Sequence, residues 1–215
     1  MTNGKIYLHN YLLIMLITDL PYFGSIGFFQ QVIKSEIICL DQAQPFSKMS
    51  FKNRMVIGTA QGPLHLTIPI LGGRDQKTPI KDIRIAYDDP WNERHFKALL
   101  SNYQRSPFFE YYKDTLFELY QTKPTFLFDF LEAAHYWSRK QLKGDWQVFK
   151  EDVNSIGNRW YDPWLPKNYM LFPNPVVYQQ VFEDKAGFLP NLSILDLLFN
   201  CGGKQGYQLM TKEQH

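Results

Sequence analysis

Lys52, Asn53 and Arg54 form a basic cluster between two stretches that alternate apolar and polar side chains. Alternate side chains of a strand share one face, so we expect Lys52 and Arg54 to point together. Two neighbouring cations repel each other unless both face water or an anion holds them. A guanidinium binds a phosphate or a carboxylate through two parallel hydrogen bonds. The cluster therefore indicates either an anion-binding site or a solvent-exposed strand face.

His95 is the second residue whose surroundings indicate chemistry. Trp91, His95, Ala98 and Asn102 recur at helical spacing and share one stripe of a predicted helix. A histidine beside an indole and an amide can act as a general base or hold a substrate hydroxyl. The other interpretation is that His95 packs where this helix meets a sheet.

Asp41 directly follows a predicted buried strand over residues 36–40. Open α/β sheets bind ligands at the carboxyl ends of their parallel strands. An aspartate at that place can bind a sugar hydroxyl or an amine, or hold a metal. It can equally cap the loop that follows the strand, and both interpretations stay open.

Other polar motifs indicate no further site. His9, His65 and His135 have no metal-ligand spacing to one another, so no metal site is predicted. The stretch CGGKQG at residues 201–206 lacks the spacing of a phosphate loop and follows a helix rather than a strand. We interpret it as a helix stop, with Gly202 or Gly203 ending the last helix.

The pattern of elements predicts how these residues are positioned. An apolar run, a glycine-containing turn, an amphipathic stretch and a second apolar run over residues 12–40 predict a strand–turn–helix–strand unit with two parallel strands. Residues 51–58 and 64–70, joined by TAQGP, predict an antiparallel hairpin. Residues 80–87 predict a further strand. We therefore predict an α/β fold with one domain, a mixed sheet, and a helical middle and C-terminal part.

Helix signals follow in the second half of the chain. Asp88-Asp89-Pro90, Ser106-Pro107 and Pro124 each precede a helical pattern, and Ser193 precedes the last one. Between them, residues 145–174 are rich in prolines and aromatic side chains, which predicts an irregular segment wrapped on the core.

Composition excludes several classes of protein. The 215 residues are 45% hydrophobic, enough for a sizeable core, and the formal net charge is only +2. The charges form no block, so neither nucleic acid nor a membrane surface is an expected partner. The apolar run at residues 11–17 is too short to span a bilayer. Cys39 and Cys201 are expected to be buried free thiols, which fits a cytoplasmic location.

Several motifs together resemble the WbqC-like protein family. They are DLPYFGSIGFF near the start, the strand with Asn53-Arg54 followed by G…L…P, the pattern W…H…Y…SPFF, and FLPNLSILDLLFNCG near the end. The first loop departs from the family pattern, in which another proline more often precedes the helix. The resemblance runs from about Met15 to Gly203. It implies a WbqC-like domain over residues 15–215 and an N-terminal extension over residues 1–14.

The resemblance also implies a function. WbqC-like proteins are often encoded among genes for O-antigen or other surface polysaccharides, and glycyl or aminoacyl transfer to an amino sugar has been suggested for some of them. The matched polar positions in this chain are Tyr22, Asn53, Arg54, Trp91, His95 and Tyr103.

We therefore expect a cytoplasmic transferase whose partner is a small-molecule substrate, an activated or nucleotide-linked sugar or an aminoacyl donor. Arg54 and Lys52 would hold a phosphate or carboxylate. The catalytic positions would be His95, which takes the proton from the attacking group, and Asp41, which orients the acceptor. Substrate binding would further involve Asn53, Tyr22, Trp91 and Tyr103. No cofactor is indicated.

The alternative function is a non-catalytic module that binds a sugar phosphate or a partner protein. In that case the aromatic-rich segment 160–178 would be the interaction surface. An enclosed pocket that joins Arg54, His95 and Asp41 would favour the enzyme, whereas an open aromatic patch would favour the module.

Overall fold

The computed structural model describes residues 16–47, 49–72, 77–151, 158–159, 167–173 and 175–212. It confirms the predicted α/β class and a single domain, with one parallel and one antiparallel sheet. The N-terminal extension predicted over residues 1–14 lies outside the described residues.

The first sheet contains four parallel strands in the order β5-β2-β1-β6. They are β1 (Leu16–Thr18), β2 (Ile37–Asp41), β5 (Gln147–Glu151) and β6 (Asn158–Arg159). Helix α2 (Ile26–Ser35) joins β1 to β2, so the predicted strand–turn–helix–strand unit is confirmed. The prediction of an irregular segment over residues 145–174 was wrong for β5, whose alternating residues pair with β2.

The second sheet is the predicted hairpin, formed by β3 (Arg54–Thr59) and β4 (Gly62–Thr67). Strand β3 begins only at Arg54, because residues 51–53 form a turn. The side-chain alternation expected between Lys52 and Arg54 therefore does not apply. The strand predicted over residues 80–87 is instead the short 3₁₀ helix η1 (Ile80–Asp82), followed by single bridges at Arg84 and Ile85.

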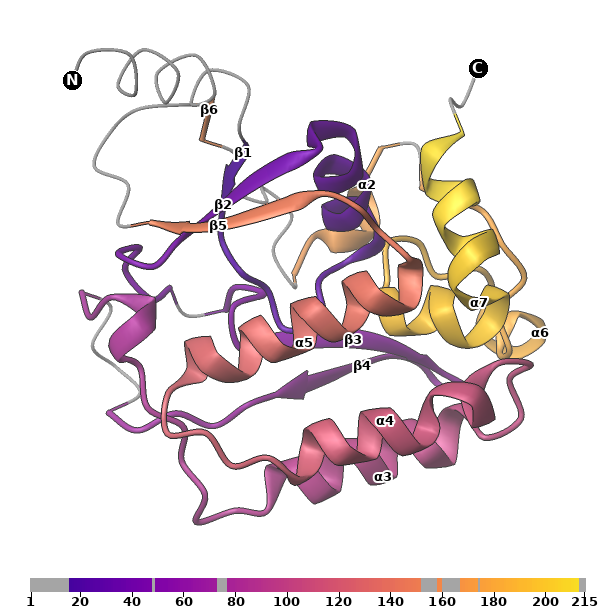
Figure 1. Cartoon of the computed structure of the whole chain (residues 1–215). Coiled ribbons are helices and arrows are strands. Elements are labelled where there is room, and N and C mark those ends of the chain that lie inside the picture. The colour runs from indigo at the N-terminus through magenta and orange to yellow at the C-terminus, as the bar shows by residue number, and fades with distance from the viewer. Residues whose placement is uncertain are drawn as a thin grey trace.

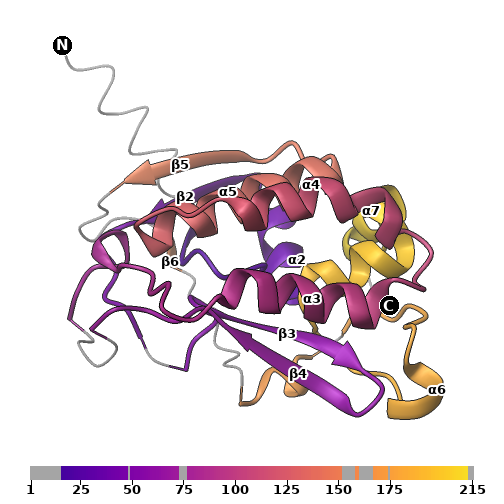
Figure 2. The same ribbon diagram turned by 90° about the horizontal axis from the view of Figure 1, so that it is seen from below.

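Helices separate the two sheets. Three of them follow the predicted signals, namely α3 (Trp91–Tyr103), α4 (Phe109–Gln121) and α5 (Leu127–Leu142). In Figure 1 the parallel sheet lies above α5 and the hairpin lies below it. Figure 2 shows the helices between β5 and the hairpin. The short elements η2 (Tyr169–Leu171) and α6 (Glu183–Ala186) complete the described structure.

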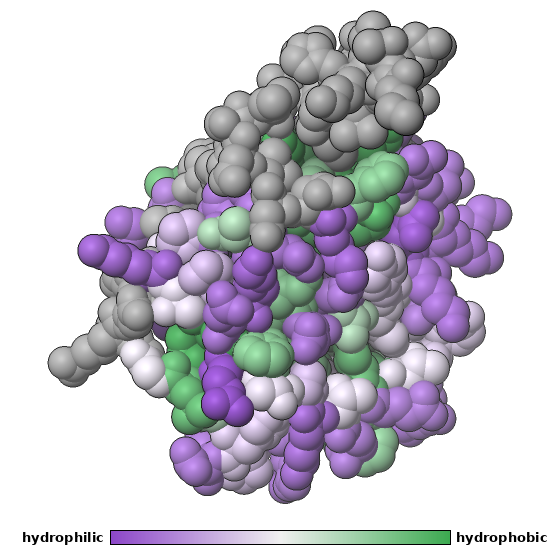
Figure 3. Space-filling model, turned by 60° about the vertical axis from the view of Figure 1, so that its left-hand side comes forward, coloured by the Kyte–Doolittle hydropathy of each residue, from purple (hydrophilic) through white to green (hydrophobic). Residues whose placement is uncertain are grey.

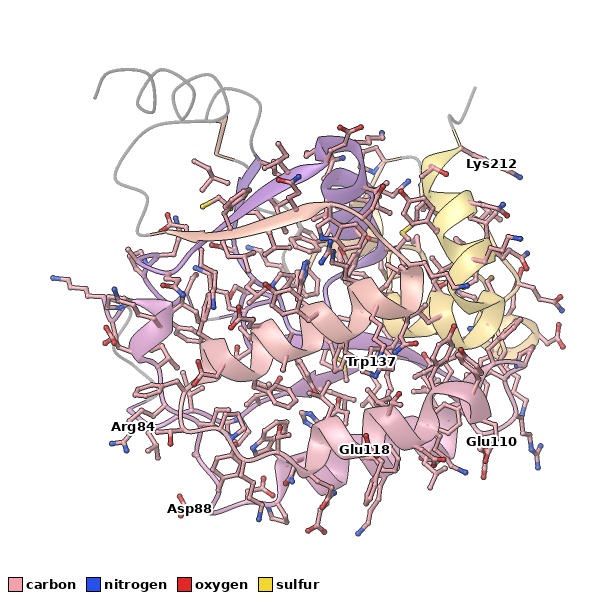
Figure 4. All side chains as sticks on the ribbon, in the orientation of Figure 1. Arg84, Asp88, Glu110, Glu118, Trp137 and Lys212 are labelled. Carbon is pink, nitrogen blue, oxygen red and sulfur yellow. The ribbon has the colours of Figure 1, made fainter. Side chains whose placement is uncertain are left out.

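The core is built from aromatic side chains that the helices bring together. Trp137 of α5, labelled in Figure 4, donates a hydrogen bond from Nε1 to Thr115 of α4 at 3.1 Å. Its ring lies edge-on to Phe23 and packs against Tyr112. Buried tryptophans usually have such a partner for the indole N–H. The aromatic side chains around Trp137 therefore form part of the packed core.

Helix α7 (Ile194–Thr211) begins as predicted but does not stop at the glycines. The hydroxyl of Ser193 caps it by accepting from the backbone N–H of Leu195 at 3.3 Å. The helix kinks at Gly202, whose φ of 73° is accessible to glycine, and then continues to Thr211. The regular helix is therefore interrupted at Gly202, as predicted, but a second helical stretch follows directly, which the prediction did not include.

Gly203 lies where α7 touches α5, and its replacement is a test of that packing. A Cβ atom built on Gly203 would lie 1.8 Å from the backbone oxygen of Gln141. Because backbone atoms cannot yield as a side chain can, we expect Gly203→Ala to lower the free energy of unfolding by about 1–3 kcal/mol. Urea denaturation measures this value.

Gly206→Ala is the matched control in the same helix. Its Cβ would meet side chains rather than backbone, with Leu197 at 3.3 Å and Leu142 at 4.0 Å. Since alanine has the higher helix propensity, we expect no loss of stability or a small gain. Equal effects of the two substitutions would contradict the close contact between α7 and α5.

Two smaller findings concern membrane-spanning helices and the two cysteines. In the described ranges, no helix is long and apolar enough to cross a membrane. Cys39 and Cys201 are both buried, as expected.

Candidate functional site

Two aspartates meet at the carboxyl end of the parallel sheet. Asp19 directly follows β1, and Asp41 is the last residue of β2. Thr18 pairs with Leu40 in the β1–β2 register, so the next residue of each strand places Asp19 beside Asp41. The pKa of Asp19 is raised, first by burial and to a smaller extent by the charge of Asp41. This is the edge at which open α/β sheets bind ligands.

Lys52 forms an ion pair with the first of these two carboxylates. Its ammonium Nζ lies 3.4 Å from Oδ2 of Asp19 and donates to the backbone carbonyl of Pro45 at 2.8 Å. The Gln44 side-chain oxygen lies 3.5 Å from the same nitrogen. With only 4% of its surface exposed, Lys52 is a buried cation that the protein itself neutralises. We name Asp19, Asp41 and Lys52 the carboxylate cluster.

Asp19 has the electrostatic character of a proton acceptor. Burial raises its pKa, the charge of Lys52 lowers it, and the charge of Asp41 raises it again, with a net rise. Its Oδ1 atom is buried and makes no hydrogen bond within the described part of the chain. The side chain as a whole is still 23% exposed, so Asp19 also reaches the surface.

His95 belongs to a buried chain of hydrogen bonds. Its Nδ1 atom lies 3.0 Å from the hydroxyl of Tyr22, which lies 2.5 Å from the hydroxyl of Tyr120. The ring also hydrogen-bonds the backbone of Thr67. Trp91 packs edge-on against the imidazole, with ring centroids 5.3 Å apart. We name Tyr22, His95 and Tyr120 the tyrosine–histidine chain.

Burial keeps the imidazole of His95 neutral. It lowers the pKa of His95 to about 4, and the neighbouring charge of Arg94 acts in the same direction. A neutral ring can accept a proton, but here its partners are a phenol and a backbone group of the protein. A role as general base therefore requires the ring to leave one of these partners.

Arg54 lies at the start of the hairpin, and its contacts are with residues outside the carboxylate cluster. Its Nε atom donates to the hydroxyl of Thr67 at 2.9 Å, and its charge lowers the pKa of the exposed His65. Since the backbone of Thr67 also binds His95, this threonine connects Arg54 with the tyrosine–histidine chain. Arg54 as a residue is half-buried.

The remaining predicted positions have structural partners. Asn53 donates from Nδ2 to the backbone oxygen of Ile68 at 2.8 Å, which extends the pairing of the hairpin. Tyr103 donates to Asp196 at 2.5 Å and accepts from the backbone N–H of Gly58, within the core. Trp91 is fully buried, and its indole N–H makes no hydrogen bond in the described ranges.

The structure thus places five of the eight predicted residues in two neighbouring groups. Tyr22, Trp91 and His95 come together in one, and Asp41 and Lys52 in the other. Residues 19–22 link the groups, and the N–H of Tyr22 donates to the carbonyl of Phe51, next to Lys52. The sequence analysis missed Asp19. This residue follows β1 in the way that Asp41 ends β2, so the rule that ligands bind at the carboxyl ends of parallel strands would have found it too.

Three cavities among the described residues have other linings. One lies between α4, α5 and α7, one beside η1, and one between α6 and the segment before it. The face that comes forward in Figure 3 is mostly hydrophilic, with apolar side chains in separate patches. The carboxylate cluster is therefore defined by its position in the sheet and its charges rather than by one of these cavities.

Comparisons with known proteins give one match. The family model described as the WbqC-like protein family matches residues 20–151, more than half of the 215 residues. This range includes the tyrosine–histidine chain, Asp41, Lys52 and Arg54. No curated protein and no solved structure matches the chain.

Proposed function

The chain belongs to the WbqC-like protein family, and from this premise we propose that it is a group-transfer enzyme of surface-polysaccharide biosynthesis. Its substrate would be an activated or nucleotide-linked sugar, and the reaction an acyl transfer, such as glycyl or aminoacyl transfer, onto an amino sugar. The observation that carries the proposal is the carboxylate cluster at the carboxyl end of the parallel sheet.

Asp19 is the proton acceptor in this proposal. The acceptor's amine or hydroxyl forms a bond to the transferred acyl carbon and gives its proton to the carboxylate of Asp19, whose side chain is 23% exposed. The bond from the acyl carbon to its activating group breaks in the same exchange. Asp41 orients the acceptor, and Lys52 fixes the position of Asp19. A raised pKa favours this role because general bases work best when their pKa lies near the operating pH.

Arg54 holds the phosphate or carboxylate of the donor. Its Nε atom donates to the hydroxyl of Thr67, and an arginine anchored in this way can still grip an anion with its terminal nitrogens. We assign Tyr22 and His95 to positioning of the segment 19–22 that carries Asp19. If His95 were instead the proton acceptor, it would have to release Tyr22 or Thr67.

Asp19→Asn tests the role of the carboxylate. Ligands are first found by screening the melting temperature against nucleotide sugars, aminoacyl donors and amino sugars, because a ligand that binds only the folded state raises it. With the substrates so identified, mass spectrometry of the product measures turnover. Since the amide cannot accept a proton, we expect turnover to fall by about 100-fold or more.

Asp88→Asn is the matched control, because it makes the same chemical change at an exposed aspartate before α3. We expect its turnover to equal that of the unchanged protein. Normal turnover in Asp19→Asn, with the fold intact by circular dichroism, would refute the role of Asp19.

A non-catalytic binding module is the second candidate function. It is favoured by exposed apolar side chains at Met170, Leu171 and Val177, of which Leu171 is 73% exposed. Part of the predicted interaction segment 160–178 lies outside the described residues. A ligand that raises the melting temperature without yielding product from any donor and acceptor pair would favour this function.

A further inference from the structure

A cavity of about 610 Å³ lies where α4, α5 and α7 meet, and neither the carboxylate cluster nor the tyrosine–histidine chain lines it. Cavities of this size hold small organic ligands. Its lining residues include Phe108 and Tyr111 at the start of α4, Gln141 at the end of α5, and Gly203 and Gln208 of α7.

The charges around this cavity have one sign. The lysines Lys140, Lys143, Lys204 and Lys212 line it, and none of the described lining residues carries a carboxylate. All four lysines are exposed. Lys212, labelled in Figure 4, extends from the end of α7. Glu110, beside Tyr111, is paired with Lys113. Four cations around one cavity repel each other, so an anion that enters it relieves this repulsion.

Aromatic side chains stand at the same cavity. Tyr111 is 77% exposed and packs edge-on against Tyr112, with ring centroids 4.9 Å apart. Phe108 is 38% exposed. The faces of aromatic side chains stack on flat rings. The lining therefore offers surface for a planar group as well as for negative charge.

The walls of this cavity are fixed by close packing. The hydroxyl of Tyr112 accepts from the backbone N–H of Gly203 at 2.8 Å. Gly202 and Gly203 leave no room for a Cβ atom against Phe108 and the backbone of Gln141. Gly202 and Gly203 are thus required by packing, and they bring α4, α5 and α7 together around the lysines.

We propose that this cavity binds an aromatic organic phosphate of the nucleoside diphosphate class. The lysines would contact the phosphates, and Tyr111 would stack on the base. A concave site of this volume fits a small molecule better than a membrane, which offers a flat surface.

This site is separate from the proposed transfer site. Lys143 precedes β5, so the cavity lies at the amino end of that strand, whereas Asp19 and Asp41 lie at the carboxyl end of the sheet. Figure 1 shows α7 on the side of the molecule from which β5 starts. The inference goes beyond the proposed function and does not depend on it.

Binding of ADP and UDP tests the proposal. Isothermal titration calorimetry on the full chain is expected to show binding that weakens as salt is added, because the contacts are between charges. In the double variant Lys140→Glu with Lys204→Glu we expect the dissociation constant to rise by about ten-fold or more for either nucleotide. Both side chains are exposed, so the variant is expected to fold.

Three comparisons make the test specific. Lys123→Glu, the matched control beyond the other end of α4, should leave nucleotide affinity unchanged. Tyr111→Ala should weaken binding of ADP but not of inorganic pyrophosphate, which has no base to stack. Asp19→Asn should not affect either ligand.

Two results would overturn the proposal. The first is that the double variant Lys140→Glu with Lys204→Glu binds the nucleotides as tightly as the unchanged protein does. If Arg54→Ala then loses nucleotide affinity, the nucleotide binds at the transfer site instead. The other is binding to anionic lipid vesicles without binding of ADP or UDP, which would make the lysines a membrane-contacting surface.

Discussion

His95→Ala is expected to lower the free energy of unfolding by about 3–5 kcal/mol. The substitution removes a fully enclosed imidazole that packs against Trp91, and it leaves the hydroxyl of Tyr22 with Tyr120 alone. It also removes the hydrogen bond to the backbone of Thr67. Lost packing and unsatisfied buried polar groups each cost free energy, and here they act together. Urea denaturation at pH 7 measures the effect.

Two variants show whether this cost comes from the hydrogen bonds. His95→Gln keeps a donor and an acceptor, so it should recover part of the lost stability. His65→Ala, at an exposed histidine, should change the free energy of unfolding far less. If His95→Ala abolishes turnover while stability stays within about 1 kcal/mol of the unchanged protein, the positioning role fails and the role as proton acceptor gains support.

The part of the fold that follows local rules could be predicted from the sequence. Two short apolar runs around an amphipathic stretch defined the β1–α2–β2 unit, and Ser193 marked the start of α7. Asp41 was found by its place after a strand. The prediction failed for β5, because an edge strand with exposed Phe149 pairs on one side only and lies in a proline-rich, aromatic segment.

The candidate site depended on contacts that local pattern does not encode. Lys52 was expected to point with Arg54, but a turn at residues 51–53 directs it to Asp19 instead. The pairing of Tyr22 with Tyr120 joins residues 98 positions apart. Whether a histidine packs or reacts is decided by such distant partners, so sequence spacing around His95 left both interpretations open.

Acid is expected to destabilise the protein through its buried histidines. Burial lowers the pKa of His135 to about 3, with the charge of Arg139 acting in the same direction, and the pKa of His95 to about 4. In the unfolded chain both have an ordinary pKa near 6.5. Below pH 6.5 the unfolded state therefore binds protons that the folded state does not. Their stabilisation is complete above pH 6.5 and is lost as the pH falls towards 4 and 3.

Two carboxyl groups oppose this trend. Burial raises the pKa of Asp196 and of Asp19, so the folded state takes up these protons before the unfolded state does. That uptake stabilises the folded protein as the pH falls towards the ordinary aspartate range. The net pH profile thus mixes both signs, and one histidine has to be removed to isolate its share.

His135→Gln isolates the share of His135. The ring stacks on Phe29 and accepts from Nε1 of Trp146 at 3.3 Å, and a glutamine carbonyl can accept the same hydrogen bond without titrating. Between pH 7 and pH 4.5 we expect the unchanged protein to lose about 2–3 kcal/mol more stability than this variant. Urea denaturation across this range measures the difference. If the two pH profiles are parallel, His135 becomes protonated in the folded protein. That result would contradict its enclosure between Phe29 and Trp146.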